Sequence, residues 1–381
     1  MKAFENALVY VYGEGLKKTS IAFDQRIRSF GSAEGAEKIQ LPPCARVVPG
    51  FIDRHVHGAG GCDAMDASRA ALGTIADELA REGTVGFLAT TMTQSEQNIT
   101  RALGAVKDYV QSGAKSGARL IGVHLEGPFI SAPYKGAQPG EYIVKPSAEL
   151  FDSFNKASGN NIKAVTLAPE EEGADELIAH LKKIGADASI GHTAAKYADV
   201  ERAVKLGAGS VTHTYNGMTG IHHRDAGAAG GALLFDELNC ELICDGIHVS
   251  VPAMKLLCKC KPASKISLIT DSIRAKRVAG GVSELGGQTV YVNGNEARLK
   301  DGTLAGSVLK MNEAVKNLNE LVGVPFERAV DCASINPALS LGIEKDCGSI
   351  EIGKRADFAV LGDGYEVLLT VRGGEIVYKR S

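Results

Sequence analysis

Short apolar runs of strand length recur through the middle of the chain, separated by segments whose apolar residues repeat at helical spacing. This alternation predicts strands followed by helices, and therefore a parallel sheet. Eight such runs argue for a closed (β/α)₈ (TIM) barrel of the α/β class, with a doubly wound open sheet as the alternative. The expected strands are residues 48–53, 85–90, 120–124, 163–168, 188–192, 210–213, 241–244 and 266–270.

Helical periodicity is clearest between these runs. Residues 68–81 place Ala71, Leu72, Ile75 and Leu79 on one face, which is typical of an amphipathic helix. Residues 175–184 and 197–206 repeat the pattern, and a glycine directly follows each segment as a stop signal. A helix over 307–322, with the segment around 326–341, would complete the outer layer.

The two ends of the chain show a different pattern. Short runs rich in β-branched and aromatic residues, punctuated by glycine turns, occur before residue 48 and after residue 355. They predict a small β-sandwich domain built from both termini, namely 1–47 and 345–381, around a catalytic barrel over 48–344. The expected strands are 7–12, 20–23, 45–48, 356–361, 367–371 and 375–378.

Composition and charge exclude several classes of partner and location but do not identify a function. The 381 residues carry a net charge of -3, so neither nucleic acid nor an anionic membrane surface is an expected partner. No apolar run approaches the roughly 20 residues that span a bilayer, and the N-terminus lacks an apolar signal core. The 8 cysteines show no disulfide framework in a chain of this length. A cytoplasmic location is the resulting expectation.

Candidate chemistry gathers at the ends of the expected strands. His55 and His57 are two residues apart, so a strand would direct both imidazoles to one side. In a (β/α)₈ barrel the carboxyl ends of the strands share one mouth, so polar residues there should converge. The predicted metal ligands are His55, His57, Glu126, His192, His213 and Asp271.

Four imidazoles and two carboxylates suit Zn²⁺ or Fe²⁺, whereas Mg²⁺ and Ca²⁺ prefer oxygen ligands. A bound divalent ion can activate water at neutral pH, and an acid/base group must then move the proton. Asp271, the last carboxylate in strand order, is the candidate for that role. This chemistry suits hydrolysis of an amide, imide or ester. His124 could orient a ligand, and His180 is expected at the surface.

In combination, these motifs resemble the N-acetylglucosamine-6-phosphate deacetylases of the amidohydrolase superfamily. The resemblance rests on residues 49–58, 124–129, 191–193, 213–218, 245–249 and 270–271. It implies a metal-dependent hydrolase that converts N-acetylglucosamine 6-phosphate and water to glucosamine 6-phosphate and acetate, usually as a homodimer.

The resemblance also implies roles for the predicted ligands. Glu126, His192 and His213 match the family's main metal ligands, and Asp271 matches its catalytic acid/base. His55 and His57 match a further pair that only some members have, so the chain could hold one ion or two.

Substrate contacts follow from the same resemblance. Asn216, Gly217 and Arg224 match phosphate-binding positions, and the arginine can come from the neighbouring subunit in the family. His248 matches a substrate-binding histidine. Ala137 and Gln138 lie where the family contacts the reacting acetamide, but relatives usually carry histidine in place of Gln138. Glutamine can donate an N–H but cannot carry a positive charge, which puts substrate preference in doubt.

Two other interpretations remain open at this point. The chain could deacetylate the galactosamine isomer or hydrolyse a cyclic amide. This alternative stays open because Gln138 replaces the histidine that relatives usually carry. It could also be a non-catalytic scaffold, although such proteins tend to lose ligands and none is missing here.

Overall fold

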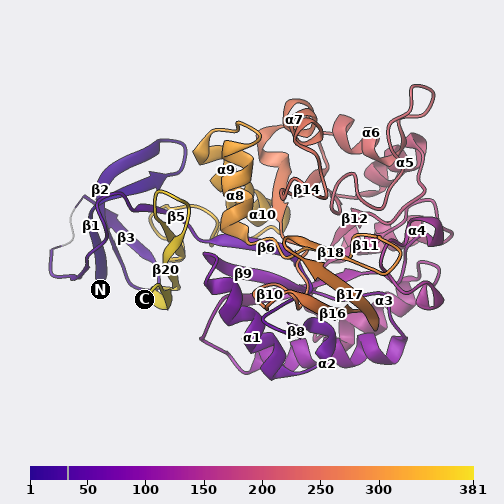
Figure 1. The fold of residues 1–381 in the computed structure, drawn as a ribbon, viewed down its shortest axis with the longest axis horizontal. Coiled ribbons are helices and arrows are strands. Elements are labelled where there is room, and N and C mark those ends of the chain that lie inside the picture. Colours follow the sequence, from indigo (N-terminus) through magenta and orange to yellow (C-terminus); the bar gives the residue numbers. More distant parts are fainter. Residues whose placement is uncertain (32–33) are drawn as a thin grey trace.

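The computed structural model describes residues 1–31 and 34–381. Its larger part is an eight-stranded parallel sheet in which the strands follow one another in sequence order (Figure 1). All residues of the first two strands are buried, as expected when helices cover a parallel sheet. The strands are β6 Phe51–Val56, β9 Thr84–Thr90, β10 Arg119–Glu126, β11 Ile162–Leu167, β12 Asp187–Ile190, β13 Ser210–Val211, β14 Asn239–Ile243 and β15 Ile266–Ile269.

Backbone hydrogen bonds between the first and last segments close this sheet into a barrel. Asp271 N–H, just beyond β15, donates to His55 O at 2.9 Å. His57 N–H donates to Ser272 O at 2.9 Å, and Val56 and Ser272 form a parallel bridge. The doubly wound open sheet is therefore excluded, and the expected (β/α)₈ barrel is confirmed.

A helix follows each barrel strand. Ser68 accepts a hydrogen bond from Ala71 N–H and so caps the first helix, while Gly185 and Gly207 end two others in the left-handed conformation. The helices are α1 Arg69–Ala80, α2 Glu96–Gln111, α3 Ala148–Ala157, α4 Ala174–Ile184, α5 Tyr197–Leu206, α6 Gly227–Leu234, α7 Val251–Cys260, α8 Met311–Glu320, α9 Phe326–Ala333 and α10 Ile335–Ser340. Short 3-10 helices occupy connecting loops at Ala64–Asp66, Ala132–Tyr134, Gly140–Tyr142 and Ala263–Lys265.

Several expected boundaries differ from those in the structure. The run 48–53 is interrupted at Gly50, because its first part, β5 Arg46–Pro49, pairs with the terminal sheet. A Cβ atom at Gly50 would lie 2.3 Å from Val85 Cγ1, so the close approach requires glycine. Residues 307–310 are not helical, since Ser307 bridges Ser272 beside the barrel. Two helices that meet at Ser334 occupy the segment 326–341, which was expected to contribute to the outer layer.

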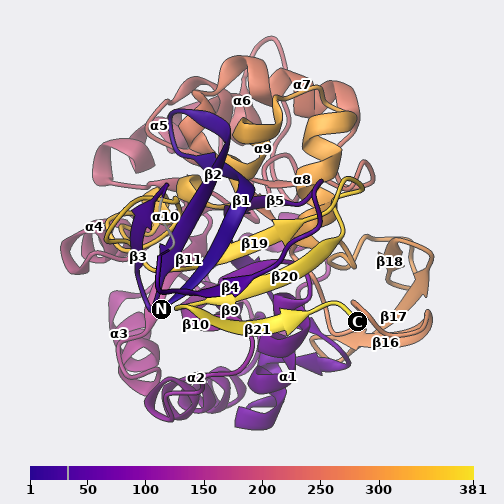
Figure 2. The ribbon, with the colours of Figure 1, turned by 90° about the vertical axis from the view of Figure 1, so that its left-hand side faces the viewer.

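The termini form the expected small β domain, and Figure 2 looks onto it. Its strands belong to one hydrogen-bonded sheet, in which β5 joins N-terminal β1 to C-terminal β19. Phe4, Phe23 and Phe358 pack together in its core with ring centroids 5.1–5.7 Å apart. The remaining strands are β1 Lys2–Val11, β2 Gly15–Phe23, β3 Ile27–Phe30, β4 Glu37–Ile39, β19 Phe358–Leu361, β20 Val367–Arg372 and β21 Glu375–Lys379.

Two further sheets adjoin the barrel, and neither was expected. A two-stranded hairpin, β7 Gly58–Ala59 and β8 Cys62–Asp63, follows β6. A three-stranded antiparallel sheet, β16 Gly281–Leu285, β17 Gln288–Asn293 and β18 Glu296–Arg298, is inserted between β15 and α8. In Figure 1 this inserted sheet lies in front of the barrel strands.

Candidate functional site

The carboxyl ends of the barrel strands bring all the predicted metal ligands together. They come from five different strands, either from the last residues of a strand or from the turn directly after it. Each is buried, with at most 8% of its surface exposed. The residues are His55, His57, Glu126, His192, His213 and Asp271.

Glu126 lies at the centre of this group. Its Oε1 atom is 3.3 Å from His192 Nε2 and 3.1 Å from His213 Nε2, and the two nitrogens are themselves 3.1 Å apart. Three donor atoms at such separations can share one cation.

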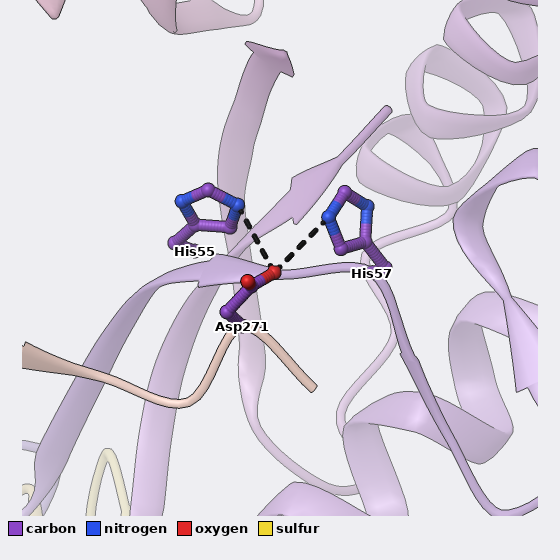
Figure 3. Close-up of side chains that lie close together, drawn as sticks. All are labelled: His55, His57 and Asp271. Atoms are coloured by element: carbon purple, nitrogen blue, oxygen red, sulfur yellow. Dashed lines mark ion pairs between the residues drawn. The ribbon is translucent and has the colours of Figure 1, made fainter. Parts of the chain in front are cut away.

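His55, His57 and Asp271 form a second group beside the first (Figure 3). Asp271 Oδ1 is 3.4 Å from His55 Nε2 and 3.2 Å from His57 Nε2. Glu126 also reaches this group, because its Oε1 is 3.4 Å from His55 Nε2 and its Oε2 is 3.2 Å from His57 Nε2. The Glu126 carboxylate thus lies between the two groups and can serve both.

In each of the four histidines, a hydrogen bond at Nδ1 orients the ring so that Nε2 faces the candidate metal centre. Every Nδ1 atom lies within hydrogen-bond distance of an oxygen that can only accept, so in the neutral ring Nδ1 carries the proton and Nε2 presents a lone pair. The acceptors are Glu241 Oε2 for His55 at 3.0 Å, Thr90 O for His57 at 3.2 Å, Tyr134 O for His192 at 2.9 Å and Asn216 O for His213 at 3.1 Å.

These donors fit a divalent metal ion that accepts nitrogen and oxygen ligands. His55 Nε2 is buried and has no hydrogen-bond partner among the described residues, although two carboxylates face it. Burial disfavours a charged His57, but hydrogen bonds from the His57 ring to the Asp271 and Glu126 carboxylates, together with their negative charge, outweigh burial and raise the pKa of His57 to about 10. The centre therefore strongly favours a positive charge between its carboxylates.

Unusual backbone conformations aim three of these side chains inward. His192, His213 and Asp271 have φ angles of 49°, 28° and 47°, in the left-handed region that costs a non-glycine residue roughly 1–3 kcal/mol. Hydrogen bonds of the surrounding backbone maintain this geometry. Ser131 N–H donates to His192 O at 2.8 Å, and Ser307 N–H donates to Asp271 O at 2.8 Å.

A buried ionic network supports the centre from inside the barrel, and sequence reasoning missed it. Arg54 is fully buried, and its Nε lies 2.9 Å from Glu241 Oε1 while its Nη2 lies 2.6 Å from Asp187 Oδ2. The other oxygen of Glu241 accepts from His55, so one carboxylate links the arginine to a candidate ligand. The sequence signal for this network was Glu241 itself, a charged residue within a largely apolar strand.

His124 belongs to the supporting layer and not to the ligand set. Its ring nitrogens lie 3.2 Å from Arg54 O and 2.7 Å from Thr166 Oγ1. Burial, together with the charge of His55, lowers the pKa of His124 to about 3. A neutral His124 therefore packs against the His55 ring, with centroids 4.5 Å apart.

Above the centre lies a cavity of about 200 Å³. Its walls include most of the predicted substrate-binding residues, together with five of the six predicted ligands; His55 lies beneath them. The expected contact residues along this wall are Ala137, Gln138, Asn216, Gly217 and His248.

The family model described as "Amidohydrolase family" matches residues 46–377. The chain belongs to the amidohydrolase family. This amidohydrolase is 45% identical to the N-acetylglucosamine-6-phosphate deacetylase of Bacillus subtilis, over 90% of this chain and 87% of the relative. It is 39% identical to the N-acetylgalactosamine-6-phosphate deacetylase of Escherichia coli O157:H7, over 84% of each chain.

A solved structure supports the same assignment of the amidohydrolase fold. A mutant N-acetyl-D-glucosamine-6-phosphate deacetylase from Mycobacterium smegmatis, in complex with N-acetyl-D-glucosamine 6-phosphate, superposes with a TM-score of 0.91. The two sequences are 29% identical over 99% of each chain. The resemblance inferred from the strand-end motifs is confirmed, and with it a hydrolase whose centre suits a divalent metal.

Gln138 has a different environment from the one expected. Its Nε2 donates to Glu126 Oε2 at 2.7 Å, and its Oε1 accepts from Thr93 N–H at 2.7 Å. One N–H of the amide is therefore used to hold a candidate ligand, and the second N–H remains for a molecule in the cavity.

Of the other predicted substrate contacts, His248 and Asn216 line the cavity and Arg224 does not. His248 Nδ1 lies 2.6 Å from Asp245 Oδ2, which leaves its Nε2 for the cavity. The Asn216 amide donates to His213 O at 3.2 Å and so also shapes the turn that carries a candidate ligand. Arg224, by contrast, is exposed in the turn between Ile221 and Asp225 and does not line the cavity of this chain.

The inserted sheet β16–β18 and the loop after it complete the cavity wall, which sequence reasoning also missed. Leu285, Thr303 and Leu304 line the same cavity as the predicted ligands. Gln288 on β17 donates to Ala137 O at 2.5 Å and ties the insert to the loop after β10. The alternating run 288–293 with glycines on both sides was a hairpin signal in the sequence.

Proposed function

We propose that this amidohydrolase removes the acetyl group of N-acetylglucosamine 6-phosphate and releases glucosamine 6-phosphate and acetate. The observation that carries the proposal is the shared position of Glu126 between two groups of metal-binding side chains, directly beneath a small polar cavity. Relatives with this activity, similar along most of their length, support the choice of substrate.

The metal is proposed to be Zn²⁺ or Fe²⁺, held by Glu126, His192 and His213, with His55, His57 and Asp271 able to hold a second ion. When bound, such an ion polarises the acetamide carbonyl and lowers the pKa of water. One ion or two can therefore supply the chemistry.

Asp271 is proposed as the acid/base residue. It lies at the cavity wall, and one of its oxygens is engaged by His55 and His57. The carboxylate accepts a proton from the attacking water as the new C–O bond forms. It then gives that proton to the amide nitrogen, so that the C–N bond breaks and a neutral amine leaves.

Substrate recognition is proposed to divide along the cavity wall. Gln138 and the backbone near Ala137 face the acetamide, while Asn216, Gly217 and His248 face the sugar phosphate. Arg224 would reach the phosphate of a neighbouring subunit, which requires a homodimer. We propose that the enzyme acts in the cytoplasm; within the described residues, no helix has the length and apolarity to cross a membrane.

A galactosamine isomer remains the second candidate substrate, because a relative with that activity is 39% identical to this chain. Metal-loaded protein should be incubated with N-acetylglucosamine 6-phosphate, its galactosamine isomer and both unphosphorylated sugars, with acetate measured. Acetate release fastest from the glucosamine phosphate is expected. Folded protein with a measured metal content that releases no acetate from it would refute the proposal, and faster release from the isomer would favour the alternative.

A further inference from the structure

A second polar cavity lies at the seam between the terminal sheet and the barrel. It encloses about 710 Å³ and is lined by the end of α2, the start of β10 and the turn between β20 and β21. Figure 2 faces the terminal sheet, with these elements in its lower half. Arg119 begins β10 and Glu126 ends it, so the cavity lies roughly 23 Å along the strand from the proposed metal centre.

Cations dominate the wall of this seam cavity. Lys115, Arg119, Arg355 and Arg372 line it, and Glu375 is the one acidic residue of the lining. The Glu375 carboxylate is already paired with Lys2 at 2.8 Å.

The arginines differ in how far their charges are balanced. Arg355 Nε is 3.2 Å from Asp357 Oδ2. Within residues 1–31 and 34–381, Arg119 and Arg372 have no carboxylate within ion-pair distance. The wall therefore carries uncompensated positive charge.

Hydrogen bonds to backbone carbonyls hold the Arg372 side chain in the wall of the seam cavity, together with the other cationic residues. It donates to Ala114 O and Ser116 O, each at 3.3 Å, and so links the terminal sheet to the loop after α2. Burial lowers the pKa of Arg372, Asp357 opposes that effect, and repulsion from Arg119 and Arg355 adds to it. An anion bound between these guanidinium groups would offset the repulsion between their charges.

A buried donor at the same wall is also without a partner. Tyr109 on α2 is 7% exposed, and its hydroxyl has no hydrogen-bond partner among the described residues. A buried hydroxyl without a hydrogen bond is costly, and Tyr109 is one of the residues that line the seam cavity.

We infer that the seam cavity binds a phosphate dianion, carried either by a phosphorylated small molecule or by free phosphate. Planar guanidinium groups bind phosphate oxygens in pairs, and Arg119 and Arg372 approach from the barrel and the terminal sheet respectively. The site is separate from the proposed reaction centre, and a bound anion would hold the two parts of the molecule together.

Inorganic phosphate is the probe that tests this site. Phosphate should be titrated calorimetrically into the full-length, metal-loaded protein, into Arg119→Gln, and into Arg101→Gln, which changes an arginine on the exposed face of α2. Arg119 makes only a long contact with Cys347 Sγ at 3.8 Å, so its replacement should not impair folding.

We expect about tenfold weaker phosphate binding in Arg119→Gln, and a smaller rise of melting temperature with phosphate, while Arg101→Gln behaves as the unaltered protein. Arg119→Glu should abolish the phosphate binding that Arg119→Gln weakens. Glucose 6-phosphate that displaces phosphate from the Arg119-dependent site would identify a sugar phosphate as ligand, and failure to displace would identify free phosphate. Phosphate binding that is equal in all variants, or absent from the unaltered protein, would overturn the inference.

Discussion

Gln138 donates its side-chain Nε2–H to Glu126 Oε2 at 2.7 Å, while Thr93 N–H fixes the other end of the amide. The amide can therefore adopt only one orientation, and it directs a donor at the carboxylate shared by both groups of candidate ligands. The residue that departs from the usual family pattern thus acts on the centre itself, as well as lining the cavity.

Gln138→Glu should weaken metal binding about 10- to 100-fold, the range found when a group that orients a metal ligand is lost. The new carboxylate could still accept from Thr93 but would repel Glu126. Metal affinity should be measured by competition with a chelator. Gln111→Glu makes the same change at the exposed end of α2 and should leave affinity unaltered. Equal affinity in both variants would contradict the assigned role of the Gln138–Glu126 bond.

Glu241→Gln should destabilise the protein by about 3–5 kcal/mol, because it removes a partner of the fully buried Arg54. It also replaces the anion that holds His55 Nδ1, so metal at the His55–His57 group should be lost before metal at Glu126, His192 and His213.

Denaturant unfolding and the metal-to-protein ratio check both parts of this prediction. Glu201→Gln is the matched control, because Glu201 is 44% exposed and pairs with Lys205 at the surface. It should change stability by less than about 1 kcal/mol. A stable Glu241→Gln protein with full metal content would show that the buried network does not support the centre.

Asp271→Asn should reduce turnover by about 10²- to 10⁴-fold, since the amide cannot accept the proton from water. The other predicted ligands are untouched, so the protein should keep at least one metal ion per chain. Acetate release and metal content measured on the same sample separate the two effects. Turnover that persists at the unaltered rate would assign the proton transfer to another group.

Asp331→Asn should raise the melting temperature above about pH 6 and have little effect at pH 4. Asp331 on α9 accepts from Tyr10 OH at 2.8 Å across the seam, and burial raises the pKa of Asp331 from 3.8 to about 6 despite that hydrogen bond. A carboxyl with a raised folded pKa contributes stability below its unfolded pKa and loses it as the pH rises through the folded value.

Melting curves across pH 4–8 for the unaltered protein, Asp331→Asn and the exposed-turn variant Asp363→Asn test this dependence. Asparagine retains an acceptor for Tyr10, so the hydrogen bond itself is preserved. A benefit of Asp331→Asn that is equal at both ends of the range would rule out titration of Asp331 as its cause.

The sequence by itself determined the strand–helix repeat and the end of the barrel at which the candidate ligands lie. Strand-length apolar runs, helical spacing and glycine stops gave α5 at residues 197–206 without error, because local periodicity reflects which face of an element is buried. The same register put His55, His57, Glu126, His192, His213 and Asp271 at the carboxyl ends of strands, where closure of a barrel must gather them.

Only the tertiary structure decided which side chains meet across long separations in sequence. Barrel closure brings Arg54 to Glu241 and Asp187, and the loop after β10 brings Gln138 to Glu126. Docking of the terminal sheet places Arg372 in the same cavity wall as Arg119. The interruption at Gly50 and the place of β16–β18 have the same origin. Periodicity specifies a face, but the partner on that face is set by packing and by the charge balance of buried groups, which no local pattern encodes.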